Sequence, residues 1–246
     1  MVLPYALVDT PGAAGGSSPR RAELPSALMS SSKSAQATTR VDRRKARTRE
    51  ALVEAAVALI ADGRGERASI SEITETADVG FGSFYNHFES KEQLFRTASE
   101  RLLERWGEAI DSACRGLTDP AEVFAVSFRV SGRLGWTNPP MARFLLGCGF
   151  EVIDAELGLA PRALRDIKAG QASGRFTVRE ADVALSASAG ALLGLLRHGL
   201  AEPDHVDEGV VDDTAAAMLR MLGVPPAKAA SLAARPLPNV RESLGA

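Results

Sequence analysis

The stretch spanning residues 69–94 constrains the fold of this chain more than any other part of the sequence. Its pattern describes two short helices, a tight turn between them and the start of a third helix. Ser69 and Glu72 have the S-x-x-E spacing of a capping box, which predicts a helix that begins there and runs to about Ala77. The helical pattern then breaks, and Gly80 is predicted to supply the positive φ of a sharp turn. This order of elements is typical of a helix-turn-helix.

A second short helix is predicted from Phe81 to His87, and its two faces differ. Phe84 and Phe88 are four residues apart, so they are expected to join Ile73 in the core. The outward face then carries hydrogen-bonding groups, which suits a DNA duplex: Gly82, Ser83, Tyr85, Asn86 and His87.

Residues 79–95, VGFGSFYNHFESKEQLF, resemble the DNA-binding domain of the tetracycline repressor-like (TetR) transcriptional regulators, and the similarity extends back to Arg47. The resemblance implies a three-helix DNA-binding domain, a larger helical effector-binding and dimerisation domain, and a homodimer. The predicted contacts to phosphates and base edges in this region are Ser69, Phe81, Gly82, Ser83, Tyr85, Asn86, His87 and Lys91. Where relatives often carry Ser or Thr and then Lys, this chain has Gly80 and Gly82, whose backbone amides can approach a phosphate closely.

A basic run precedes the helix-turn-helix. The net charge of the whole chain is only -2, so affinity for DNA has to come from local patches of charge. Residues 40–49 contain six basic side chains against the single acid Asp42. We predict phosphate contacts from Arg43, Arg44, Lys45 and Arg47, and the alternative is a solvated charge run at a domain edge.

Composition divides the chain of 246 residues into four parts. Residues 1–40 are rich in Ser, Ala, Gly and Pro and lack any helical or alternating period, so they are predicted to be a disordered extension. The helix-turn-helix domain is predicted at 41–88, the effector-binding and dimerisation domain at 89–223, and a tail at 224–246. The N-terminus does not resemble a signal peptide, and translation from Met29 instead of Met1 stays open.

The part after the helix-turn-helix is predicted to be entirely helical. Ser90 and Gln93 have the spacing of a second capping box, with Lys91 in the first turn, where a cation opposes the helix dipole. That helix is expected to run to about Arg115. No later stretch alternates convincingly between polar and apolar residues, so the fold class is all-α.

The segment 181–201 is predicted to be a buried helix, because its apolar part is too short and too interrupted by Ser for a membrane span. Gly190 and Gly194 are one turn apart and allow another helix to approach closely. The family resemblance places a dimer interface here, predicted to include Gly190, Leu193, Gly194 and Met218. Packing inside one monomer is the alternative.

The resemblance also implies an effector cavity in the second domain. Large apolar side chains with a few polar neighbours typically line such pockets. The predicted lining is Trp106, Phe124, Phe128, Trp136, Met141, Phe144 and Cys148, with Ser127, Arg129 and Asn138 as further polar candidates. For each of these residues, ordinary core packing is the competing interpretation.

The sequence does not favour catalysis, since it contains no phosphate-binding loop, nucleophile motif, metal-ligand spacing or cofactor signature. The two cysteines, Cys114 and Cys148, are read as reduced thiols, with a disulfide as the alternative. We therefore predict a cytoplasmic repressor that binds a palindromic double-stranded DNA operator as a homodimer and is released by a small molecule, without contact to a membrane. An activator of the same fold and a helical module that sequesters small molecules or binds proteins remain as alternatives.

Overall fold

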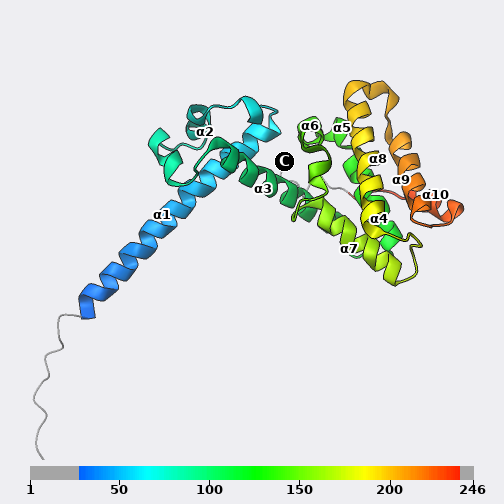
Figure 1. Cartoon of the computed structure of the whole chain (residues 1–246), viewed down its shortest axis with the longest axis horizontal. Coiled ribbons are helices and arrows are strands. Elements are labelled where there is room, and N and C mark those ends of the chain that lie inside the picture. The colour runs from blue at the N-terminus through cyan, green and yellow to red at the C-terminus, as the bar shows by residue number, and fades with distance from the viewer. Residues whose placement is uncertain (1–27, 239–246) are drawn as a thin grey trace, which may run out of the picture. The chain divides into compact units, whose positions relative to one another are not determined.

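A computed structural model describes residues 28–238, and every regular element in that range is helical, which confirms the predicted all-α class. The chain divides into two compact units, Met1–Arg44 and Lys45–Ala246. In chain order the elements (Figure 1) are α1 (Leu28–Ala61), η1 (Gly65–Arg67), α2 (Ile70–Thr76), η2 (Phe81–Asn86), α3 (Lys91–Ala113), α4 (Pro120–Gly132), α5 (Leu134–Thr137), α6 (Pro139–Cys148), η3 (Gly149–Val152), α7 (Leu159–Ala172), α8 (Ala181–Ala201), η4 (Pro203–His205), α9 (Glu208–Met221) and α10 (Pro226–Ala233).

The first helix begins earlier than its composition suggests. α1 starts at Leu28, so residues 28–40 are helical, which differs from the irregular chain predicted for them. This segment contains no proline, and extending an existing helix costs far less than nucleating a new one. The disorder predicted for residues 1–27 lies outside the described residues.

The helix-turn-helix has its own hydrophobic core. Ile73, Phe84 and Phe88 are buried together, as their spacing predicts. They pack with the inner faces of α1 and α3, which contribute Leu52, Val53, Ala56, Leu59, Leu94 and Ala98. Side-chain capping begins α2, because the Ser69 Oγ accepts a hydrogen bond from the Glu72 amide at 3.2 Å. This core fixes which face of η2 stays outside.

Two local details of the turn differ from the sequence prediction. The residue with positive φ is Asp78 (φ 52°), whereas Gly80 has a φ of −64°. Asp is one of the few residues with a side chain that enters the left-handed region readily. The second element, η2, is a 3-10 helix and ends at Asn86. Such helices are short, and this one follows Gly80, which cannot provide a side-chain cap.

The long helix α3 is shared by two hydrophobic cores. Its N-terminal residues Leu94 and Ala98 belong to the core of the helix-turn-helix, while Leu103, Trp106 and Ile110 pack with α4 and α6. The predicted cap is present: the Ser90 Oγ accepts from the Gln93 amide at 3.2 Å. The Gln93 side chain accepts from the Glu89 amide at 2.7 Å.

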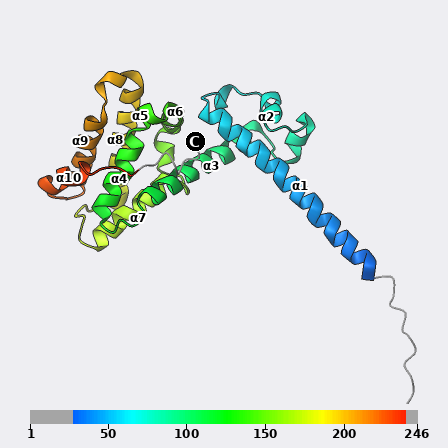
Figure 2. The same ribbon diagram turned by 180° about the vertical axis from the view of Figure 1, so that it is seen from behind.

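Helices α4 and α7–α10 form the main core of the C-terminal part. Asp119 caps α4 and Asn138 caps α6, as the Asp-Pro and Asn-Pro steps predict. Figure 2 shows α4, α8 and α9 side by side, and these helices contact one another. The segment after residue 224, predicted to be a tail, includes α10, whose buried Ala229, Leu232 and Ala233 pack in this core.

By length and composition, α8 is the one helix of the described chain that could cross a membrane. This is weak evidence, because core helices of soluble proteins have the same properties. Here α8 contacts α4, α5, α6 and α7, but only 33% of its apolar window is buried, so the helix is less buried than predicted.

Candidate functional site

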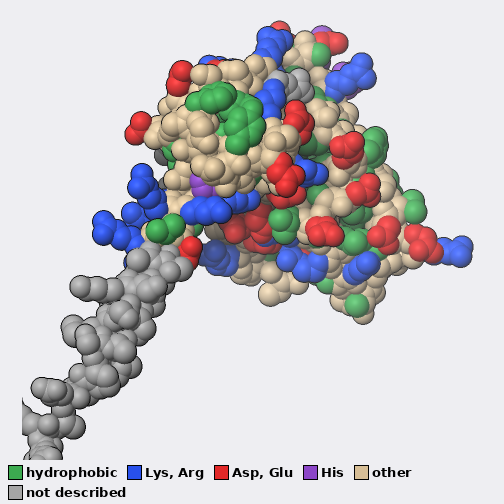
Figure 3. Space-filling model, turned by 60° about the vertical axis from the view of Figure 1, so that its left-hand side comes forward, with side chains coloured by type: hydrophobic (Ala, Val, Ile, Leu, Met, Phe, Trp, Pro, Cys, Tyr) green, Lys and Arg blue, Asp and Glu red, His purple; other side chains and the backbone are tan. Residues whose placement is uncertain are grey.

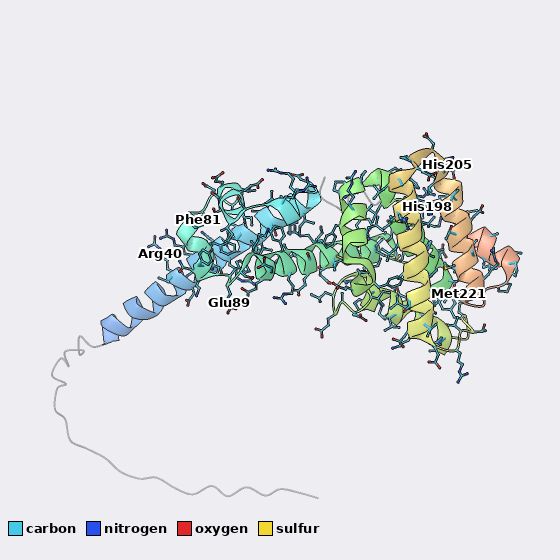
Figure 4. All side chains as sticks on the ribbon, turned by 45° about the horizontal axis from the view of Figure 1, so that its top comes forward. Arg40, Phe81, Glu89, His198, His205 and Met221 are labelled. Atoms are coloured by element: carbon cyan, nitrogen blue, oxygen red, sulfur yellow. The ribbon has the colours of Figure 1, made fainter. Side chains whose placement is uncertain are left out.

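The outward face of η2 is the first candidate site. Gly82, Tyr85 and Asn86 are exposed, while Ser83 and His87 are half-buried. Phe81, on the outer side of η2 (Figure 4), is 55% exposed, and Tyr85 is 59% exposed. Large exposed aromatic side chains on a short polar helix indicate a surface that contacts another molecule.

Aromatic contacts hold Tyr85 in place. Its ring lies edge-on to Phe84, with centroids 5.3 Å apart, and edge-on to Phe81 at 6.3 Å. Phe84 is fully buried, so it anchors the Tyr85 ring to the core beneath. A positioned tyrosine with its outer surface in solvent can contact base edges or phosphates without losing much conformational freedom.

His87 faces cations of α1. Burial lowers the pKa of His87, and the charges of Lys45 and Arg49 lower it further. The His87 Nδ1 is buried and has no hydrogen-bond partner within the described residues. The Arg49 guanidinium lies 4.9 Å from the ring centroid of Phe88, the residue next to His87. A neutral imidazole between two cations is a suitable environment for an anion such as a phosphate.

Figure 3 shows Lys and Arg side chains spread over the visible face among Asp and Glu side chains, with several of them together at the left of the view. The predicted phosphate contacts of α1 are all exposed: Arg43, Arg44, Lys45 and Arg47. These four residues span little more than one turn of α1, so several cations lie close enough together to contact one polyanion.

Two predicted contact residues also stabilise the free chain. Ser69 caps α2, and the Lys91 Nζ donates to the Ala68 carbonyl at 3.2 Å. The Lys91 Nζ also lies 5.8 Å from the Phe95 ring centroid. These interactions join the start of α2 to α3, so replacing either residue affects the fold as well as a surface.

The second candidate site is a cavity of about 310 Å³ among α3, α4, α7 and α8. Its apolar lining includes Ile110, Phe124, Phe128, Leu145, Leu159, Leu185 and Leu192. The volume is at the lower end of the range for small-molecule sites. It suits a ligand of roughly one ring.

A charged wall completes the cavity. Asp111 of α3 lies opposite Arg162, Arg165 and Asp166 of α7, and all four line the cavity. The Arg162 Nε donates to Asp111 at 2.7 Å, and the Arg165 Nη2 donates to Asp111 at 3.2 Å. The wall therefore offers guanidinium donors and carboxylate acceptors with balanced charge.

A smaller polar group lies elsewhere in the lining. The Cys114 Sγ is 3.5 Å from the Ser127 Oγ, and burial raises the pKa of the Cys114 thiol. Both cysteines are free thiols in the structure. Ser127 was predicted as a polar candidate and lines the cavity, whereas Cys148 does not.

Only some of the apolar residues predicted for the cavity line it in the structure. Phe124 and Phe128 line it, while Trp106, Trp136, Met141 and Phe144 lie outside its lining. Trp106 approaches it indirectly, since its Nε1 donates to the Ser131 Oγ at 3.4 Å and Ser131 does line the cavity. Two further polar candidates also lie elsewhere: Asn138 caps α6, and Arg129 pairs with Asp212 of α9.

The charged wall was not predicted from the sequence. Arg162, Arg165 and Asp166 have the spacing of one helix face, which is normally a solvated surface. Only the packing of α7 against α3 brings them to Asp111.

The residues predicted for a dimer interface have mixed environments. Gly194 has open space where a side chain would be, and Gly190 lies against the Phe150 ring. Leu193 lines the cavity, and Met218 packs on the main core. Nearby apolar residues of α8 and α9 are exposed: Val183, Val210 and Met221, the last labelled in Figure 4.

We expect stability to decline at acidic pH. The Arg162 guanidinium and the Gly158 amide lower the pKa of Glu104 to about 2, and Arg175 lowers that of Asp119. A carboxylate with a lowered pKa stabilises the fold above its unfolded pKa and loses that contribution as it protonates. Melting temperature should therefore fall as pH drops from 4.5 toward about 2. Thermal unfolding over this range measures the effect, and Glu104→Gln should show a shallower dependence. An identical slope in this variant would contradict the assignment.

Comparisons with known proteins agree with this geometry. Residues 52–98 match the family described as bacterial regulatory proteins, tetR family, and residues 119–235 match the tetracyclin repressor-like C-terminal domain. The structure of RolR in complex with resorcinol is 35% identical, with a TM-score of 0.66, covering 81% of this chain and 99% of RolR. RolR without ligand is 37% identical, with a TM-score of 0.65, covering 78% and 98%.

More distant similarity concerns the fold alone. A TetR-family transcriptional regulator from Haemophilus influenzae RD is 14% identical, with a TM-score of 0.54, covering 72% of this chain and 97% of the other. The comparison with curated proteins gives no match.

Proposed function

Since the chain belongs to the TetR family of bacterial transcriptional regulators, we propose that it is a repressor that binds a palindromic DNA operator as a homodimer and releases it when a small effector occupies the C-terminal cavity. One observation carries the proposal: the same chain presents an exposed polar face on η2 and, among α3, α4, α7 and α8, a mainly apolar cavity with a charged wall. The repressor would act in the cytoplasm, without a catalytic step or a cofactor.

The DNA contacts divide into two kinds. Tyr85 and Asn86 are exposed on η2 and are proposed to reach base edges in the major groove. Gly82 leaves the backbone of η2 open, since nothing lies within 4 Å of where its side chain would be. The second kind are contacts to phosphates, which position the protein on the duplex. We propose them for Arg43, Arg44, Lys45, Arg47, Ser69, His87 and Lys91.

A dimer is part of the proposal because a palindromic operator presents two half-sites about one helical turn apart. The exposed Val183, Val210 and Met221 support a contact through α8 and α9. Gly194 supports it as well, because its open space lets a second helix approach.

We propose that the effector is a small aromatic compound with hydroxyl groups. The structure of RolR, which is 35% identical to this chain, contains resorcinol as its ligand. In this chain the cavity has room for a single ring between apolar walls. The Asp111 carboxylate can accept a hydrogen bond from a phenolic hydroxyl, and Arg162 and Arg165 can donate hydrogen bonds to the phenolic oxygen. Because the wall is balanced in charge, a neutral phenol fits it better than a carboxylate.

Fluorescence anisotropy with DNA from upstream of the chain's own coding sequence tests the proposed function. Binding should be saturable and should weaken by about three to five orders of magnitude between 50 and 200 mM salt if six to ten phosphates are contacted. Resorcinol, as the first probe of the effector class, should release the DNA. Absence of saturable, salt-sensitive binding would refute the DNA-binding role and favour a sequestering module instead.

A further inference from the structure

Gly107 is a buried glycine in the interior of α3, at a position where glycine weakens a helix. A side chain at this position would meet Arg162 of α7, because a Cβ would lie 2.6 Å from the Arg162 Nη1 and 2.8 Å from its Cζ. The Arg162 guanidinium therefore lies directly against the backbone of α3, and any other residue at position 107 would require this guanidinium to move.

Arg162 fastens α7 to α3 with several hydrogen bonds. Its Nη2 and Nη1 donate to the two carboxylate oxygens of Glu104, at 2.7 and 3.0 Å, and its Nε donates to Asp111 at 2.7 Å. Glu104 also accepts from the amide of Gly158, just before α7, at 2.9 Å. The Arg162 side chain is only 17% exposed, so solvent screens these bonds less than it screens a surface pair.

The same guanidinium lines the cavity. A ligand that hydrogen-bonds with Arg162 or Asp111 competes with the bond between them. Glu104 and Gly107, in contrast, do not line this cavity. Arg162 therefore connects the cavity lining to Glu104 of α3, while Ile110 and Asp111 of α3 line the cavity themselves.

The middle of α3, in the same turn as Glu104, is bound to the first helix of the DNA-binding domain. The Arg101 Nη1 and Nη2 donate to the Glu50 carboxylate at 2.5 and 3.2 Å, and the Arg105 Nη2 donates to Glu54 at 2.7 Å. Glu50 and Glu54 follow the basic run on α1 directly. All of these ion pairs use side chains on one side of α3. Their positions in the sequence recur at helical spacing: Arg101, Glu104, Arg105 and Asp111.

We propose that Arg162, seated on Gly107, is the positioning residue through which an occupied cavity shifts α3, and that Arg101 and Arg105 transmit this shift to α1 and so to the DNA-binding surface. The inference rests on the proposed function. Gly107 gives the Arg162 guanidinium room against the backbone of α3. The two sets of ion pairs, one with α7 beside the cavity and one with α1, meet on a single stretch of α3, where Glu104 lies between Arg101 and Arg105. The ligand shifts the equilibrium only as far as it prefers the released arrangement.

The test uses the full chain, upstream DNA and resorcinol as the probe. The coupling factor is the ratio of the operator Kd with saturating resorcinol to the Kd without it. Arg101→Gln removes the Arg101 pairs with Glu50 and Glu54 of α1 and leaves the Arg105–Glu54 pair, and it touches neither the cavity nor the predicted DNA contacts. Glu104→Gln weakens the support of Arg162 from outside the cavity. Each should reduce the coupling factor by about 2- to 30-fold. Arg101→Lys should restore part of it.

Two further readouts separate coupling from a loss of structure. Calorimetry without DNA should give Arg101→Gln a resorcinol Kd close to that of the wild type, and Glu108→Gln, an exposed carboxylate of the same helix, should keep the wild-type coupling factor. Wild-type coupling in both Arg101→Gln and Glu104→Gln would overturn this inference alone. A wild-type protein whose DNA binding is absent or ignores resorcinol would overturn the proposed function and the inference with it.

Discussion

Replacing Tyr85 and Asn86 together by Ala should weaken operator binding by about 100- to 10,000-fold, since each contact to a base is worth roughly 1–3 kcal/mol. Both side chains are exposed on η2, and neither fills the core that Phe84 and Phe88 form beneath them. The loss should therefore appear in affinity for the operator and in discrimination against unrelated DNA. Anisotropy titrations with both kinds of DNA at fixed salt measure it.

A matched control uses two exposed acids of α3, Glu100→Ala and Glu108→Ala. This variant should bind the operator at least as tightly as the wild type. Circular dichroism of the Tyr85/Asn86 variant should match that of the wild type, because the fold does not depend on these side chains. Operator binding of wild-type strength in a folded Tyr85/Asn86 variant would show that η2 does not read DNA.

Replacing Arg129 by Ala should lower the free energy of unfolding by up to about 3–5 kcal/mol, the typical cost of removing one member of a buried ion pair, and Asp212 would keep Arg133 as its one remaining partner. Arg129 is 3% exposed, and its Nε and Nη2 donate to the Asp212 carboxylate at 2.7 and 2.8 Å. Its Nη1 also donates to the Arg235 carbonyl at 2.7 Å, beyond α10. One side chain thus joins α4 to α9 and to the segment after α10. Urea unfolding measures the effect.

Arg179 provides the matched control, because it is 94% exposed at the side chain and its pair with Glu180 spans 3.6 Å. Arg179→Ala should change stability by less than about 0.5 kcal/mol. The double replacement Arg129→Met with Asp212→Leu should recover part of the loss, since both charges of this pair are removed and Arg133 keeps its pair with Glu208. An Arg129→Ala protein as stable as Arg179→Ala would refute this role for the pair.

The helix-turn-helix could be predicted because its signals are local. The caps at Ser69 and Ser90 and the four-residue spacing of Phe84 and Phe88 each act within one or two turns of helix. The positive φ was assigned to the wrong residue, since glycine is the usual choice and Asp78 is a permitted exception. Local chemistry therefore predicts elements better than it predicts individual backbone angles.

The cavity was harder to predict because side-chain size does not distinguish a pocket from a core. Trp106 and Met141 are as large and apolar as Phe124 and Phe128, yet they fill the space around α6 and do not line the cavity. The charged wall depends on a contact between Asp111 and Arg162, which are 51 residues apart in sequence. Nothing local distinguishes that pair from two solvated charges.

The packing of the C-terminal segment could not be predicted from its own residues either. The sequence after Pro225 is short and rich in alanine, and such a composition is compatible with either a tail or a small packed helix. The structure buries Ala229 and Leu232 of α10 against the main core. Whether a short apolar helix packs depends on a partner surface, here α4 and α9, that its own residues do not reveal.

Hydroxyl-radical footprinting of the full chain on its own upstream DNA tests the central claim most directly, namely that two copies of η2 enter successive major grooves and leave when the cavity fills. The account predicts two symmetric protected patches about one helical turn of DNA apart, absent for the Tyr85/Asn86 variant and lost from the wild type on addition of resorcinol. A DNA ladder with no protected patch, or protection that persists unchanged in the Tyr85/Asn86 variant, would contradict it.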